Sequence, residues 1–154
     1  MAEERAAVDR LAIVRRWAEL TPDGDWVSGM SDERQLARVE EALNELAVPD
    51  LEVVPMGGGM DGGGLVSPAR GARGVIDFWQ EWLEPWDSFT VEIGRIEEGP
   101  KAVLIEVVQR GRLRGSTGTV ETPSAAVHFF RGDRMSRIEF HLDRAGARKA
   151  AGLA

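Results

Sequence analysis

The second half of the chain, from Phe89 to Leu153, consists of strand signals joined by very short links. Four runs are rich in β-branched and aromatic residues: 89–96, 102–113, 124–130 and 135–142. The links between them contain turn-forming residues: Glu98-Gly99-Pro100, the Gly-Ser-Thr-Gly stretch at 115–118, and Gly132-Asp133. Links this short join antiparallel neighbours. We therefore predict an antiparallel meander that ends in an Ala- and Gly-rich tail.

An aromatic helix is predicted directly before these strands. It should begin near Gly74, and Pro85 marks the approach of its end. Its apolar residues recur at helical spacing: Val75, Phe78, Trp79, Trp82, Leu83 and Trp86. A curved sheet packed against such a helix encloses an apolar space. We assign Trp86 to the core, and Trp79 or Trp82 to the wall of a ligand pocket.

The first half of the chain predicts two more helices and a short strand. Apolar residues at helical spacing indicate a helix over residues 3–20, which a Thr-Pro-Asp-Gly turn follows. A second helix should begin at Ser31 as its N-cap and end before Pro49. Residues 50–55 read as a strand, and the glycine-rich stretch at 57–64 as a loop. Residues 1–154 thus predict one α+β domain, in which a cone-shaped, curved antiparallel sheet wraps around N-terminal helices.

Composition and charge exclude several classes of function. The net charge of −7 argues against nucleic-acid binding, and the absence of cysteine excludes thiolate chemistry. The two histidines lack metal-ligand spacing, and the glycine-rich stretch lacks the ending of a phosphate-binding loop, so we expect neither a metal nor a cofactor. The first ten residues are charged, and no apolar run is long enough for a bilayer. We expect a cytoplasmic protein with no membrane partner.

Strand parity predicts which side chains face the helices. Ile138 and Phe140 alternate with Glu139 and His141, so the first two should face inward and His141 should be exposed. In the long strand the inward parity consists of Ile105, Val107 and Gln109, and the outward parity carries the arginines at 110, 112 and 114. Gln109 is therefore a single amide on an apolar face. Residues 124–130 are apolar on both parities, so parity alone does not orient His128.

The aromatic helix, the strand VPDLEVVP and the segment RGDRMSRIEFHLDRAGARKAAGL resemble the nuclear transport factor 2-like superfamily. Within it the chain resembles the SnoaL-like branch, which includes relatives of polyketide cyclases, limonene epoxide hydrolase and ketosteroid isomerase. The resemblance begins near residue 5 and includes an insertion at residues 21–41. It implies a cone-shaped fold around a pocket, often assembled as a homodimer, and it turns Ser124, Ala126 and His128 inward.

The same resemblance does not supply a known catalytic set. The chain has no tyrosine, so the oxyanion hole of ketosteroid isomerases has no counterpart. The Asp-Arg-Asp positions of limonene epoxide hydrolase correspond to Val107, Gln109 and Phe140. No catalytic residue is assigned, and His128 is a weak candidate for a general base. The alternative, which we prefer, is a partly buried histidine that makes structural hydrogen bonds.

Three functions remain open from the sequence. The preferred one is a pocket for a small hydrophobic molecule, because a few polar groups among apolar walls are typical of ligand sites. The expected lining is Trp79, Trp82, Val107, Gln109, Ser124, Ala126, His128, Ile138 and Phe140. The second is an isomerase, cyclase or hydrolase with His128 as base. The third is a non-catalytic module that dimerises through its outer sheet face, where Val108 and Phe129 lie among charges.

Overall fold

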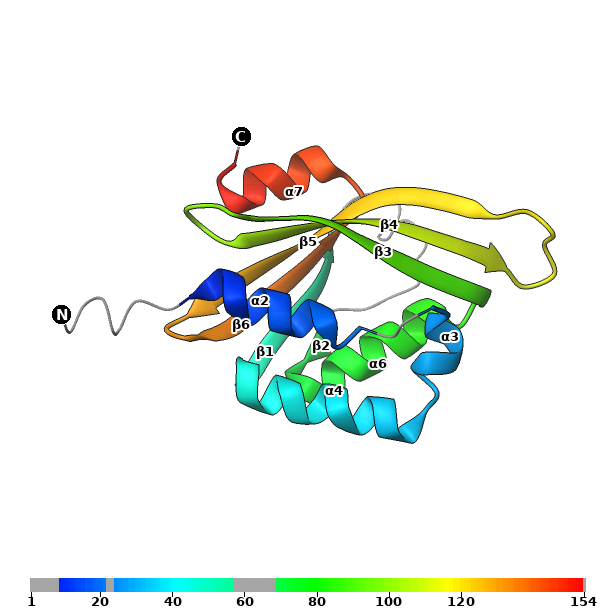
Figure 1. Cartoon of the computed structure of the whole chain (residues 1–154), viewed down its shortest axis with the longest axis horizontal. Coiled ribbons are helices and arrows are strands. Elements are labelled where there is room, and N and C mark those ends of the chain that lie inside the picture. The colour runs from blue at the N-terminus through cyan, green and yellow to red at the C-terminus, as the bar shows by residue number, and fades with distance from the viewer. Residues whose placement is uncertain (1–8, 22–23, 57–68, 154) are drawn as a thin grey trace.

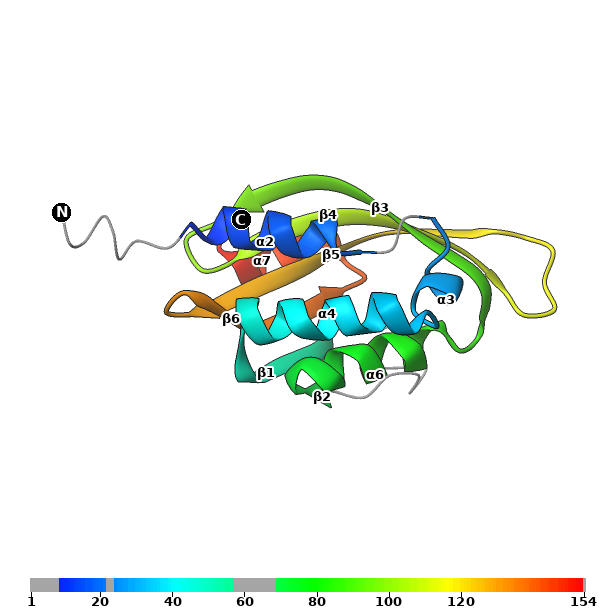
Figure 2. The same cartoon turned by 60° about the horizontal axis from the view of Figure 1, so that its bottom comes forward.

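The computed structural model describes residues 9–21, 24–56 and 69–153, which form helices packed on both sides of one curved sheet (Figures 1 and 2). The helices are α2 (Arg10–Glu19), α3 (Trp26–Gly29), α4 (Glu33–Leu46), α6 (Gly71–Leu83) and α7 (Arg144–Ala151). The strands are β1 (Ala47–Met56), β2 (Ala69–Arg70), β3 (Trp86–Glu98), β4 (Val103–Leu113), β5 (Val120–Arg131) and β6 (Arg134–His141). No helix of the described residues is long and apolar enough to cross a membrane.

The six strands lie in the order β2-β1-β6-β5-β4-β3. Strands β3 to β6 form the expected antiparallel meander, and β2 is antiparallel to β1. The exception is β1, which runs parallel to β6, so the sheet is mixed. Register shifts between Ile93 and Ile96 in β3, and between Phe129 and Phe130 in β5, bend these strands. The fold is therefore the predicted α+β arrangement of a curved sheet against N-terminal helices.

One face of the sheet packs against α2, α4 and α6, and the main hydrophobic core lies between them. Leu43 of α4, Ile76 and Phe78 of α6, and Ile138 of β6 are almost completely buried there. Each such side chain stabilises the fold by about 1.5–3 kcal/mol relative to its exposed state. Helix α2 packs against β3 and β4 on this face of the sheet (Figure 2). This arrangement leaves the cavity described below between α2, α6 and the sheet.

Part of the opposite face of the sheet is covered by α7, a helix formed by the segment that was predicted as an Ala- and Gly-rich tail (Figure 1). The Asp143 side chain caps the helix by accepting hydrogen bonds from the backbone N–H groups of Ala145 and Gly146. Ala147 and Ala151 pack in a second, smaller hydrophobic cluster on this face, which also includes Phe129. The small side chains of Ala147 and Ala151 thus allow α7 to pack closely on the sheet.

His141 is buried under α7, so its expected exposure is wrong. Its side chain is 8% exposed, and its Nε2 lies 2.9 Å from Oε1 of Glu139. The other oxygen of Glu139 accepts a hydrogen bond from Nε of Arg137 at 2.8 Å. Parity placed these residues correctly on the outer face, but the helix that covers them was not foreseen.

Three local boundaries also differ from the sequence analysis. Asp32, one residue after Ser31, caps α4 through its side chain. Helix α6 begins at Gly71, earlier than expected, and ends at Leu83, so Trp86 opens β3 and does not extend the aromatic stripe of the helix. Helix α2 is described from Arg10. The glycine-rich stretch at 57–64, the first residues of the expected helix over 3–20, and Pro22 and Asp23 of the turn lie outside the described residues.

Candidate functional site

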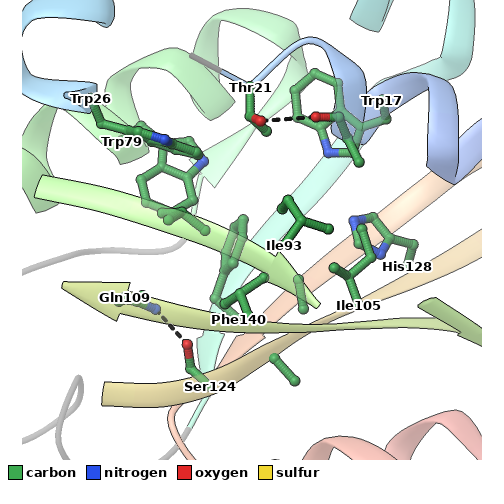
Figure 3. Close-up of a pocket in the computed structure, with 15 residues that line it drawn as sticks. Trp17, Thr21, Trp26, Trp79, Ile93, Ile105, Gln109, Ser124, His128 and Phe140 are labelled. Carbon is green, nitrogen blue, oxygen red and sulfur yellow. Dashed lines mark hydrogen bonds between the residues drawn. The ribbon is translucent and has the colours of Figure 1, made fainter. Parts of the chain in front are cut away.

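A cavity of about 60 Å³ lies between the helices and the curved sheet (Figure 3). Strands β3 to β6 form its floor, and α2, α3 and α6 form its other walls. Its lining is Trp17, Ala18, Thr21, Trp26, Trp79, Val91, Ile93, Ile105, Val107, Gln109, Ser124, Ala125, Ala126, His128 and Phe140. Most of this surface is aromatic or aliphatic. The polar groups of the floor are concentrated on Gln109, Ser124 and His128.

Most of the predicted lining residues meet around this cavity. Trp79 of α6 stands on one side and packs edge-on against Phe140 of β6, with ring centroids 5.0 Å apart. Val107 and Gln109 of β4, together with Ser124, Ala126 and His128 of β5, lie on the floor. The alternating register of β4 and β5 brings these side chains together, because Val107 pairs with Ser124 and Ile105 pairs with Ala126.

Two predicted lining residues lie elsewhere. Ile138 is completely buried and pairs with Val53 of β1 in the part of the sheet that α4 and α6 cover closely. Trp82 is one helical turn beyond Trp79 and packs near Trp86 and Phe89, with ring centroids 6.4 and 6.3 Å away. There it lines a second cavity of about 150 Å³. Ile138 and Trp82, which were predicted to line the first cavity, therefore do not line it.

Gln109 lies at the boundary of both cavities. Besides Gln109 and Trp82, the second cavity is lined by Trp86, Phe89, Gly111, Val120, Thr122 and Leu142. The Nε2 group of Gln109 donates a hydrogen bond to Oγ of Ser124 at 2.7 Å, as Figure 3 shows. This bond holds the amide in place between the two spaces. A third hollow, more polar and outside the cone, lies beside α3 and α6 and is lined by Met30, Gln80, Glu84 and Arg114, among others.

His128 is the buried titratable group of the cavity. Its Nδ1 lies 3.2 Å from the backbone oxygen of Val103. Burial lowers the pKa of His128 to about 4, and the hydrogen bond to Val103 only partly opposes this shift. The ring is therefore neutral at neutral pH. Because a carbonyl oxygen can only accept, Nδ1 carries the proton, and Nε2 retains its lone pair.

The helix side of the cavity contains residues that the sequence analysis did not assign to a site. Trp17 and Ala18 come from the end of α2, Thr21 follows its C-cap Leu20, and Trp26 comes from α3. The helical periodicity had placed Trp17 and Ala18 on an apolar side, which is a signal for burial but not for a cavity. Trp26 lies in the segment interpreted as an insertion. That segment therefore contributes a wall of the site.

Asp25 fixes Trp26 in position. Its carboxylate caps α3 by accepting from the N–H of Val27 at 3.1 Å, and it also accepts from the N–H of Phe89 in β3 at 3.0 Å. Burial alone would raise the pKa of Asp25, but the hydrogen bonds from Phe89, Ser28 and Val27 outweigh it and lower the pKa. One ionised side chain thus joins α3 to the edge strand of the sheet.

Trp26 itself packs closely but leaves one polar atom unsatisfied. Its ring centroid is 4.6 Å from that of Trp79, and its side chain is almost completely buried. Within the described part of the chain, no group accepts a hydrogen bond from the indole N–H of Trp26. A buried donor without a partner costs about 1–3 kcal/mol. This helix-side wall is therefore apolar in its contacts and less stable than a fully satisfied one.

The cavity offers hydrogen bonds but no charge. None of its described lining residues is an aspartate, glutamate, lysine or arginine. Among the described residues, no group of three or more histidines, cysteines, aspartates or glutamates is placed to hold a metal ion. On the outer face of the sheet, Arg110 pairs with Glu92 and Glu121. The cavity is suited to bind a neutral group.

Comparisons with solved structures identify the fold. The chain is similar to a nuclear transport factor 2-like protein of unknown function from Burkholderia pseudomallei, with 16% identity, a TM-score of 0.63, and coverage of 94% of this chain and 98% of that one. It is also similar to a putative SnoaL-like polyketide cyclase from a Jannaschia species, with 13% identity, a TM-score of 0.60 and 92% coverage of both chains.

A third similar structure is that of TerC co-crystallised with polyporic acid, with 18% identity and a TM-score of 0.56. The match covers 75% of this chain and 87% of that one. No family model matches the sequence, and no curated protein matches it. At these identities the similarity establishes the architecture, which is the nuclear transport factor 2-like fold predicted from the sequence, and leaves activity to be argued from the site.

Proposed function

We propose that this protein binds a small, neutral, hydrophobic molecule in the cavity between α2, α6 and the sheet, in the manner of a SnoaL-like binding protein. The observation that carries the proposal is a set of polar groups on an otherwise apolar floor: His128 and Ser124, which are buried, and Gln109, which is half-buried. Polar atoms are costly to bury, and a few of them among aromatic walls are the usual anatomy of a ligand site. TerC, a protein of similar fold, was co-crystallised with polyporic acid, which supports a binding function for this fold.

The size of the cavity limits the ligand. About 60 Å³ accommodates a few water molecules, whereas an engineered cavity that binds benzene has a volume of about 150 Å³. A single ring therefore enters only if a lining side chain moves. Trp17 is a half-buried aromatic residue of the lining, and it lies on α2, which packs against β3 and β4. We propose that rotation of Trp17 admits the ligand.

Binding is better supported than catalysis. A general base works best when its pKa lies near the operating pH, and burial holds the pKa of His128 at about 4. A nearby carboxylate would raise that pKa, but the described lining of the cavity contains none. The isomerase, cyclase or hydrolase alternative thus lacks an effective base at His128.

Filling the cavity tests the proposal. Ala126 lines the floor, so Ala126→Leu places three more carbon atoms inside a cavity of about 60 Å³. Ala145 is exposed on α7, so Ala145→Leu adds the same group outside the cavity and serves as the matched control. Toluene, titrated by calorimetry, should bind the unmodified protein and Ala145→Leu equally. We expect Ala126→Leu to reduce that affinity at least tenfold.

Thermal melts accompany this experiment, because overpacking costs about 1–3 kcal/mol even in a protein that still folds. Equal binding of toluene by all three folded proteins would place the ligand outside the cavity. A failure of toluene to bind the unmodified protein at millimolar concentration would contradict the proposed function itself.

We also propose that the protein forms a homodimer. Phe129 was one of the residues from which we predicted a dimer contact through the outer sheet face, but it packs against the hydrophobic cluster under α7. The large hydrophobic side chains that remain most exposed among the described residues are Leu113 and Val120, which are 40% and 45% exposed. They face water at the β4–β5 hairpin, which projects beyond the rest of the molecule in Figure 1. Sedimentation that gives a mass near the 16.9 kDa of one chain at micromolar concentration would contradict the dimer.

A further inference from the structure

The hydrogen-bonding state of His128 restricts which polar group a ligand can present to it. Nδ1 faces the carbonyl oxygen of Val103 at 3.2 Å, and two acceptors cannot share a hydrogen bond, so Nδ1 must be the donor. The ring is 1% exposed and neutral, which leaves the lone pair on Nε2. No hydrogen bond to Nε2 is formed by the described residues. In Figure 3 the ring stands at the edge of the cavity opposite Trp79.

The other polar groups of the floor do not determine whether the ligand must present a donor or an acceptor. Gln109 and Ser124 bond to each other, and either could donate, because a rotated amide would accept from the hydroxyl of Ser124 with little change in shape. This pair can therefore adapt to a donor or an acceptor on the ligand. His128 cannot, since its tautomer is set by Val103 on the neighbouring strand.

We infer that the ligand carries a neutral hydrogen-bond donor, a hydroxyl group in the first instance, which donates to Nε2 of His128. The inference rests on the proposed function and narrows it to uncharged alcohols and phenols. A ketone, nitrile or ether would direct its own lone pair at that of Nε2 and would gain nothing there. A carboxylate would add the cost of burying a charge without a cationic partner among the described lining residues.

Three single-ring probes of similar size separate these possibilities. Phenol carries a donor, benzonitrile carries only an acceptor, and toluene carries neither. Each is titrated against the unmodified protein and His128→Phe, in which the ring volume is kept and both nitrogens are removed. We expect His128→Phe to weaken phenol about tenfold or more, since a buried hydrogen bond is lost. The affinities of toluene and benzonitrile should change by less than twofold.

The outcomes distinguish the inference from the function on which it rests. If toluene binds and phenol is insensitive to His128→Phe, the cavity binds ligands but the inference is wrong. If benzonitrile is weakened as strongly as phenol, Nε2 is a donor and the inference is also wrong. If none of the three probes binds the unmodified protein, the proposed function fails together with the inference.

A second measurement avoids the variant, in case the loss of the bond to Val103 prevents folding. Histidine labelled with nitrogen-15 in the unmodified protein reports each ring nitrogen separately by NMR. Saturating phenol should shift the Nε2 resonance of His128 in the direction expected for an acceptor, while toluene should leave it nearly in place. An Nε2 that does not respond to phenol, or that already carries a proton in the free protein, would overturn the inference.

Discussion

Acidification should destabilise this protein through His128. The ordinary pKa of a histidine, which applies to the unfolded chain, is 6.5, whereas burial lowers the pKa of His128 to about 4 in the folded protein. Below pH 6.5 His128 is therefore protonated in the unfolded chain, whereas in the folded protein it stays neutral until the pH approaches 4. The stability that His128 supports is present above pH 6.5 and is lost as the pH falls toward 4.

The size of this effect follows from the two pKa values. One pKa unit corresponds to about 1.4 kcal/mol, so the complete loss between the unfolded value of 6.5 and the folded value of about 4 is about 3 kcal/mol. Between pH 7.5 and pH 5 the free energy of unfolding should fall by roughly 2 kcal/mol from this residue alone. Complete burial means that solvent does not screen the effect.

Urea unfolding followed by tryptophan fluorescence measures this change at several pH values. The control is His128→Phe, which retains His141 and every carboxylate. The difference in unfolding free energy between the two proteins isolates His128, because the other titrating groups contribute equally to both. The unmodified protein should lose stability relative to the variant as the pH decreases. A difference that stays constant from pH 7.5 to pH 5 would show that the ring is solvated or protonated in the folded state, and would refute the reasoning.

Two further predictions concern the sheet and its covering helix. Gly111→Ala should destabilise the fold by about 1–3 kcal/mol, because the added Cβ would lie only 2.6 Å from Cζ3 of Trp86 and overlap that ring. The matched control is Gly118→Ala, where the atom nearest to an added Cβ is 4.0 Å away. Equal melting temperatures of the two variants would contradict the clash. Asp143→Ala should cost about 1 kcal/mol in urea unfolding through loss of the α7 cap, and an unchanged midpoint would mean that the cap contributes nothing.

The sequence predicted those features of the fold that repeat along the chain. Strand alternation put Val107 and Gln109 on one face, and helical spacing brought Trp79 over them. The parallel pairing of β1 with β6 could not be read in this way, because it joins segments far apart in the chain without a short connection. Alternation likewise placed His141 on the outer face, but it carries no information about the helix that covers that face.

Strand parity indicated which sheet residues line the cavity, but the sequence did not indicate Trp17, Thr21 and Trp26 on its helix side. Gln109 and Ser124 stand out as polar residues on an apolar parity. Trp26 has no such pattern, because it follows a turn and begins a helix of four residues. The hydrogen bond from the N–H of Phe89 to Asp25 joins this helix to β3. Contacts of this kind depend on tertiary distance, which periodicity does not encode.

The position of β1 within the sheet has a consequence for how the chain reaches its native state. Strand β1 pairs with β6, which is the last strand along the chain. Val53 can therefore pair with Ile138 only after all the segments between them have been synthesised. During synthesis, α4, β1 and α6 therefore precede the strand that completes their core. Such non-local pairing slows folding and leaves apolar surface exposed for longer. We expect nascent chains stalled before β6 to be bound by chaperones, and release of the completed strand to trigger cooperative collapse.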